Sequence, residues 1–219
     1  MDAGRWGRLT GSEKAWRRRI SAAAEALRPR ESGQKDSGLA PPCAIRESRI
    51  SCCVLKPQDI VVAIRLAIPP EREWSYPALG KALHISASEA HAAVKRAAKA
   101  GLVDAATRGV RKVALLEVLV HGVRYFLPPV WTSVTRGVPT AHAAPPLSST
   151  IVDDGLLPVW PDPEGTVRGQ GLTPIYKSVP QTAREDSTFH EWLALVDAIR
   201  AGRARERELA VRMLAERLA

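Results

Sequence analysis

The chain has 219 residues, 45% of them hydrophobic, which is enough for a substantial core over at least part of its length. Its 32 Lys and Arg residues against 23 Asp and Glu residues give a net charge of +9, which favours a polyanionic partner such as nucleic acid over an acidic protein or a neutral substrate. The longest apolar runs, such as "IVVAI" and "ALLEVLV", are far shorter than the ~20 residues of a membrane-spanning helix, so we expect no membrane partner.

The cysteine content indicates a reducing compartment. The chain has three cysteines, an odd number, and two of them, Cys52 and Cys53, are adjacent. No signal-peptide pattern accompanies them. We therefore expect a cytoplasmic protein with reduced thiols.

The positive charge lies in the first part of the chain. Residues 1–50 carry 11 Lys and Arg against 6 Asp and Glu, and residues 51–127 carry the same numbers, whereas residues 128–219 carry 10 against 11. We predict that residues 1–54 form a basic, disordered arm with one short helix around Ile20 to Leu27. Such an arm contacts a polyanion, is a solvated tail, or reflects a misassigned translation start.

Two short helices are predicted after this arm. In "KPQDIVVAIRLAI", Pro57 suits a first helical turn, Ile60 and Ile64 have helical spacing, and Pro69-Pro70 ends the pattern. The segment "YPALGKALH" predicts a second helix with its leucines four residues apart.

A third helix is predicted over Ala87 to Ala100. Ser86 is a good N-cap residue, and Glu89 three positions later completes a capping box, while Gly101 suits the left-handed position that ends a helix. Its inner face would consist of the small residues Ala90, Ala93, Val94 and Ala97, which allow close approach of the preceding helix.

Two helices joined by a short turn, the second with a cationic outer face, form the arrangement that places a recognition helix in the DNA major groove. The stretch "YPALGKALHISASEAHAAVKRAAKAGLV" resembles the winged helix-turn-helix of bacterial MarR-like transcriptional regulators, and the resemblance covers roughly residues 55–127. Two features depart from that pattern: Ala97 replaces a large leucine, and "DAATRGVRKVALLEV" lacks the second strand of a long wing.

The resemblance implies a mainly α fold with a small β wing, and a sequence-specific DNA-binding regulator, which we expect to be a repressor. Double-stranded DNA would be its partner, and a homodimer would match a palindromic site. The candidate base contacts are Ser88, His91 and Arg96, with Ala92 against a thymine methyl group. Lys95 and Lys99 would contact phosphates. The full set of predicted DNA-binding residues is Ser86, Ser88, Glu89, His91, Ala92, Lys95, Arg96, Lys99, Arg108, Arg111 and Lys112.

The simpler interpretation of the same residues is a solvated helix face, followed by solubilising charges in "RGVRK", Arg108 to Lys112. Beyond them, Leu115, Leu116 and Leu119 predict another helix, ended by Gly122 before a strand in "VRYFL".

Residues 128–182 contain 10 of the 17 prolines, which excludes long helices and central strands. We predict an extended segment that packs on this chain or on a partner. Residues 183–219 predict a helical hairpin, with Thr188 as the first cap and Gly202 as the stop. Its apolar seam would consist of Leu209, Met213, Leu214 and Leu218. This hairpin packs within the chain or forms a partner interface.

The chain lacks the common enzyme motifs. "GTVRGQG" has no P-loop lysine, and no G-x-S-x-G, H-E-x-x-H or C-x-x-C pattern occurs. We therefore expect no enzyme, no metal and no cofactor; oxidant sensing by Cys52 and Cys53 is a weaker hypothesis. The alternative function is a protein-interaction adaptor or antitoxin-like protein, whose residues 128–219 bind the product of a neighbouring gene.

Overall fold

The computed structural model describes residues 55–68, 74–151 and 155–219. The predicted basic arm with its short helix, the three cysteines and Pro69-Pro70 lie outside the described residues.

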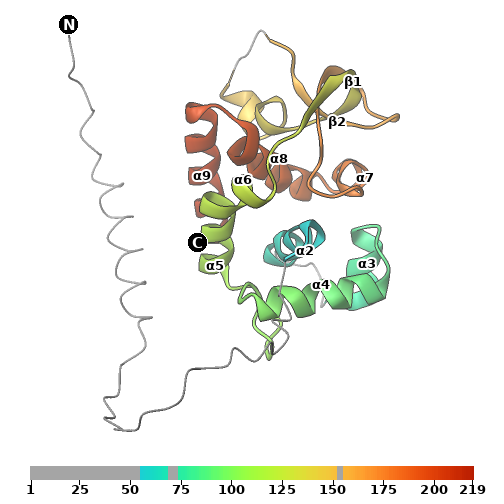
Figure 1. Cartoon of the computed structure of the whole chain (residues 1–219), viewed down its shortest axis with the longest axis vertical. Coiled ribbons are helices and arrows are strands. Elements are labelled where there is room, and N and C mark those ends of the chain that lie inside the picture. The colour runs from blue at the N-terminus through green and yellow to red at the C-terminus, as the bar shows by residue number, and fades with distance from the viewer. Residues whose placement is uncertain (1–54, 69–73, 152–154) are drawn as a thin grey trace, which may run out of the picture. The chain divides into compact units, whose positions relative to one another are not determined.

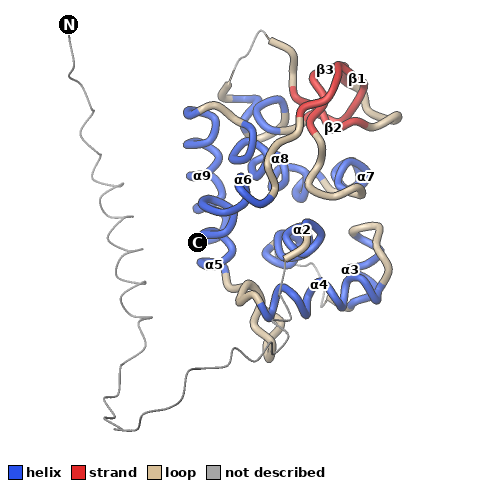
Figure 2. Tube along the Cα trace, in the orientation of Figure 1, coloured by secondary structure: helices blue, strands red, loops and turns tan. Residues whose placement is uncertain are grey.

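The described part of the chain is mainly helical, with a small three-stranded sheet, as the sequence predicts in coarse terms (Figures 1 and 2). Within the described residues no helix has both the length and the apolar character needed to cross a membrane. In chain order the elements are α2 (Pro57–Ala67), α3 (Tyr76–Ala82), α4 (Ala87–Lys99), α5 (Lys112–Glu117), a π turn (Val118–Gly122), α6 (Val123–Phe126), β1 (Trp131–Pro139), two 3-10 turns (Ala141–Ala143 and Leu147–Ser149), β2 (Pro158–Pro161), β3 (Val167–Leu172), α7 (Val179–Glu185), α8 (Ser187–Ala201) and α9 (Ala204–Leu218).

The first three described helices form where the sequence predicts them. α2 begins at Pro57, and the side chain of Ser75 caps α3 by accepting a hydrogen bond from the Ala78 N–H at 3.3 Å. Ser86 caps α4, and Gly101 adopts φ +79° beyond its end. These local signals determine the helix ends because each satisfies backbone groups that the helix leaves unpaired.

The strand predicted in "VRYFL" is wrong. The chain stays helical beyond α5, through the π turn that contains Gly122, and continues into α6. Leu115, Leu119 and Val123 are all completely buried, at spacings of four residues. Continuing the helix keeps Val123 in the core, so tertiary burial outweighs the strand preference of its β-branched and aromatic neighbours.

The proline-rich segment forms a sheet, contrary to the prediction of a merely extended chain. β1 pairs antiparallel with both β2 and β3, and β2 pairs in parallel with β3, so the three strands close on one another. Figure 2 shows them gathered in one place. The prolines fall at strand ends: Pro139 ends β1, and Pro158 and Pro161 bound β2. A proline at a strand end removes little of the hydrogen-bond ladder.

The predicted C-terminal hairpin is present, and α8 packs against α9 within the chain. α8 is the most buried helix of the described residues, since every residue from Trp192 to Arg200 is buried. Its cap differs from the prediction: the Asp186 side chain, not Thr188, accepts the Phe189 N–H at 2.9 Å. Of the predicted seam on α9, Leu214 and Leu218 are buried, and Leu209 and Met213 are partly buried against the same core.

A buried polar network holds the sheet on α8. The Asp197 carboxylate, completely buried, accepts the Trp160 indole N–H at 2.5 Å and the Thr140 hydroxyl at 3.0 Å. Arg200, three residues along the same helix, donates to Asp197 and to the Leu127 carbonyl. Burial raises the pKa of Asp197, and the neighbouring guanidinium and hydrogen bonds oppose that shift. The Asp197–Arg200 pair therefore connects α8 to β2 and Thr140 through the carboxylate, and to the end of α6 through the guanidinium.

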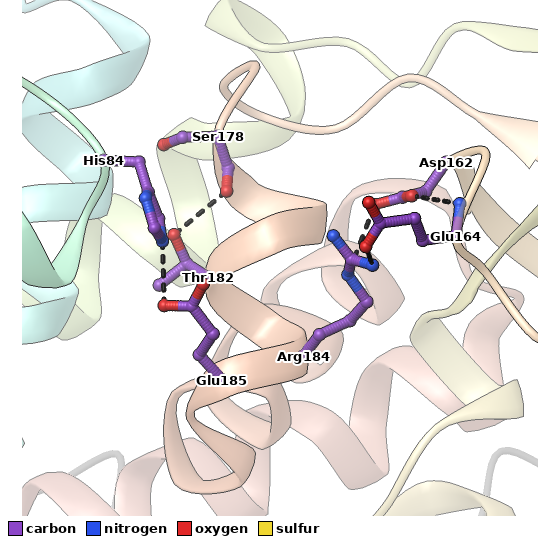
Figure 3. A network of polar contacts seen from close by, with 7 residues as sticks. All are labelled: His84, Asp162, Glu164, Ser178, Thr182, Arg184 and Glu185. Atoms are coloured by element: carbon purple, nitrogen blue, oxygen red, sulfur yellow. Dashed lines mark hydrogen bonds and ion pairs between the residues drawn. The ribbon is translucent and has the colours of Figure 1, made fainter.

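Helix α7 connects two further parts of the described chain, as Figure 3 shows. Glu185 contacts His84, in the turn between α3 and α4, with 2.8 Å between carboxylate oxygen and Nε2. Arg184 pairs with Glu164 and, at 3.6 Å, with Asp162 in the loop between β2 and β3. Two consecutive residues of one short helix thus contact the turn between α3 and α4 and the loop between β2 and β3.

We predict that Asp197→Ala destabilises the protein by about 3–5 kcal/mol, because it leaves the buried Arg200 guanidinium without its counter-ion. Urea unfolding followed by circular dichroism measures the free energy. The control is Glu191→Ala, in the same helix as Asp197. It removes the more exposed member of the Glu191–Arg217 ion pair and should lower the free energy of unfolding by at most about 1 kcal/mol. Equal losses for the two variants would contradict the importance of the Asp197 network.

His190 should make the stability depend on pH. Its Nε2 lies 2.7 Å from the Pro139 carbonyl oxygen, and burial lowers the pKa of its imidazole. At this site the unfolded chain then binds a proton more readily than the folded chain. The stabilisation that the neutral His190 contributes is therefore fully present above about pH 6.5 and is lost as the pH falls below that value. We expect His190→Gln to have a shallower loss of unfolding free energy between about pH 7 and pH 5. Parallel curves for the two proteins would refute this.

Candidate nucleic-acid interface

The turn between α3 and α4 depends on a glycine whose importance the sequence analysis missed. The Ile85 N–H donates to the Gly80 carbonyl at 2.9 Å, and between them His84 adopts the left-handed φ of +52°. A Cβ atom on Gly80 would lie only 2.7 Å from the Ile85 carbonyl oxygen. Glycine therefore permits the close approach that sets α4 against α3.

Helix α4 has the two faces that its sequence predicts. Its buried residues are the predicted small set, Ala90, Ala93, Val94 and Ala97. Since an alanine face holds a neighbouring backbone close, α4 packs tightly on both α2 and α3. On the outer face Ala92 is half-buried, and the exposed candidates are Ser86, Ser88, Glu89, His91, Lys95 and Lys99.

Two of the predicted site residues begin the helix. The Glu89 carboxylate accepts the N–H and the hydroxyl of Ser86, both at 2.9 Å, and the Ser86 oxygen accepts the Glu89 N–H at 3.1 Å. The hydrogen bond from the Ser86 backbone lowers the pKa of Glu89. This pair forms the predicted capping box, so its polar atoms are used in starting α4.

The structure places Arg96 away from the predicted base-reading position. Its Nε and one terminal nitrogen donate to the two oxygens of Asp59, at 2.8 Å and 2.6 Å. Asp59 is completely buried in the first turn of α2, whereas the Arg96 side chain is 22% exposed. A bidentate pair of this kind commits the guanidinium to the protein interior. Arg96 therefore joins α4 to α2, and its predicted contact with a base would compete with this ion pair.

An aromatic residue outside the predicted set organises two members of it. The Tyr76 ring meets the His91 ring edge-on, with centroids 4.9 Å apart, and the Trp74 ring at 5.5 Å. The Arg108 guanidinium lies 5.4 Å from the centroid of Tyr76. Tyr76 thus brings together a residue of α4 and one of the following loop. In the sequence, the signal that could have identified this residue was the tyrosine at the first helical position of "YPALGK".

Where the sequence predicts a small wing, the structure has a single β-bridge between Val103 and Val110. Asp104 holds its loop, because one carboxylate oxygen accepts the N–H groups of Ala106 and Thr107 at 2.9 Å and 2.8 Å. These hydrogen bonds lower the pKa of Asp104 to about 2. Arg108, at the end of the loop, has a left-handed φ of +57°, a conformation that is strained for a residue with a side chain.

The remaining loop cations differ in their surroundings. Arg111 lies 3.4 Å from the second oxygen of Asp104 and is partly neutralised by it. Lys112 is exposed at the start of α5. The structure thus groups His91 and Arg108 about Tyr76. Lys95 and Lys99 lie exposed along α4, whereas the Arg96 guanidinium is paired with Asp59.

The described residues contain no cluster of three or more His, Cys, Asp or Glu side chains suited to a metal ion. Comparisons with protein-family models, with curated proteins and with solved structures found no match for this chain.

We predict that Arg96→Ala lowers the free energy of unfolding by about 3–5 kcal/mol, because the buried Asp59 carboxylate would lose its cationic partner and keep only the hydrogen bond from the Lys56 N–H. The neighbouring Lys95→Ala change removes the same charge from an exposed position and should alter stability by no more than about 0.5 kcal/mol. Urea titrations of both variants provide the comparison. A stable Arg96→Ala protein would show that the ion pair does not hold α2 on α4.

Proposed function

We propose that the chain binds double-stranded DNA through the outer face of α4 and the bridge loop, and that it acts as a sequence-specific transcriptional regulator, most simply a repressor. In this proposal α3, the turn and α4 serve as a helix-turn-helix, and the Val103–Val110 bridge with its loop serves as a reduced wing of the MarR-like type.

One observation carries the proposal: the outer face of α4 presents cations that no carboxylate of the described residues neutralises. Among the described residues, no carboxylate lies within ion-pair distance of Lys95, Lys99 or Lys112. Arg108 contacts the Tyr76 ring instead of a carboxylate. Uncompensated surface cations near one helix support phosphate binding, in which released counter-ions supply much of the free energy.

The proposed contacts follow from the positions of the side chains. The first two turns of α4 would enter the major groove, where Ser88 and His91 meet base edges and Ala92 meets a thymine methyl group. Lys95 and Lys99, further along the helix, would bind phosphates. Arg96 is paired with Asp59, so a contact between its guanidinium and a base would compete with that ion pair. A homodimer would present two such helices to a palindromic site.

A second candidate function is a protein-interaction adaptor or antitoxin-like role for residues 128–219 and the helix before them. It is favoured by exposed large apolar residues near α6 and β1: Tyr125, Phe126, Val130, Trp131 and Val134. Apolar residues gathered over so short a stretch are more typical of an interaction surface than of a solvated one.

The experiment for DNA binding compares two double variants with equal charge change. We expect Lys95→Ala/Lys99→Ala to weaken binding to a labelled duplex of about 30 base pairs, and to reduce the slope of log K against log salt by about 1.8, or roughly 0.9 for each lost phosphate contact. Fluorescence anisotropy at several salt concentrations measures both quantities.

The matched control is Arg205→Ala/Arg212→Ala, which removes two exposed cations from α9. It should leave the slope and the affinity nearly unchanged. If both double variants weaken binding equally, only the net charge matters and α4 is not the interface.

A further inference from the structure

A groove separate from α4 lies between the π turn with α6 and the first turns of α9. Its volume is about 360 Å³, which is within the range of clefts that bind ligands. None of its lining residues belongs to α4 or to the bridge loop. They are Val120, His121, Arg124, Tyr125, Ala204, Arg207, Glu208 and Val211.

The groove combines apolar walls with an excess of positive charge. Val120, Val211 and Tyr125 supply apolar surface, and Tyr125 is 77% exposed, so most of its side chain is open to a ligand. Arg124 lies 5.5 Å from the Tyr125 ring centroid. No carboxylate of the described residues comes within ion-pair distance of Arg124 or Arg207.

The backbone under this groove is also irregular. Val120 and His121 belong to the π turn, which interrupts the helix between α5 and α6. A π turn sacrifices regular hydrogen bonding and occurs often at functional sites. Here it places both residues in the groove opposite α9.

We propose that this groove binds a short acidic segment of a partner protein. One or two apolar side chains of the segment would lie against Val120, Val211 and Tyr125, and its carboxylates would pair with Arg124 and Arg207. The chain's own N-terminal region is a poor occupant, because residues 1–50 carry an excess of five positive charges. Charge complementarity therefore favours a separate, acidic partner.

The test selects ligands for the native chain. A phage-displayed library of random peptides is panned against the immobilised full-length protein at moderate salt. We expect enrichment of peptides in which Asp or Glu residues flank Leu, Phe or another large apolar residue. The affinity of the best peptide is then measured by fluorescence polarisation, and analytical ultracentrifugation records the oligomeric state of each protein.

The Arg124→Glu/Arg207→Glu variant should bind that peptide at least tenfold more weakly than the native chain. Arg205→Glu/Arg212→Glu makes the same charge change outside the groove and should reduce the affinity for the peptide less than threefold. Lys95→Ala/Lys99→Ala should bind it normally, so this result does not depend on DNA binding. The proposal is overturned if no acidic and apolar motif is enriched, if both glutamate variants weaken binding alike, or if the groove variants instead dissociate a dimer.

Discussion

The ion pair between Asp59 and Arg96 determines how the candidate interface is built. A completely buried carboxylate is costly unless a cation with matching geometry compensates it, and the guanidinium of Arg96 does so with two hydrogen bonds. The pair fixes the rotation of α4 relative to α2, so the alanine face turns inward. Lys95 and Lys99 consequently turn outward. The same contact that removes one cation from the surface exposes the other two.

Much of this region could be predicted from local sequence. The capping box of Ser86 and Glu89, the left-handed Gly101 and the alanine face of α4 each follow from hydrogen-bonding or steric rules that act within a few residues. Arg96 could not be placed in this way. A long side chain at the boundary between two helix faces can turn to either, and its partner lies 37 positions earlier in the chain.

Beyond residue 112, local sequence preferences predict the structure less well, because burial in the core outweighs them. "VRYFL" has strand-forming residues, but the complete burial of Val123 in line with Leu119 keeps the chain helical. The prolines of residues 128–182 did not indicate a sheet, yet Pro139, Pro158 and Pro161 lie at strand ends, where a proline is compatible with strand pairing. The network around Asp197 joins residues more than 30 positions apart, and nothing in a single sequence pairs them.

The outer face of α4 and the groove beside α9 are both cationic, but their side chains differ in chemistry. The surface on α4 combines lysines with small and polar residues, which suits the polar edges and phosphates of a duplex. The groove beside α9 combines arginines with exposed apolar side chains, which suits a protein segment. Helix α7 contacts both the turn before α4, through a hydrogen bond between Glu185 and His84, and the loop between β2 and β3, through an ion pair between Arg184 and Asp162.

The most direct test of the central claim is selection of bound duplexes from a random pool by the native chain, followed by sequencing. If α4 reads base edges, one short sequence is enriched over successive rounds, and changing His91 to Ala alters the preferred bases at defined positions without abolishing binding. If no sequence is enriched, or if the preference is the same for the His91→Ala protein, α4 does not read DNA as we propose.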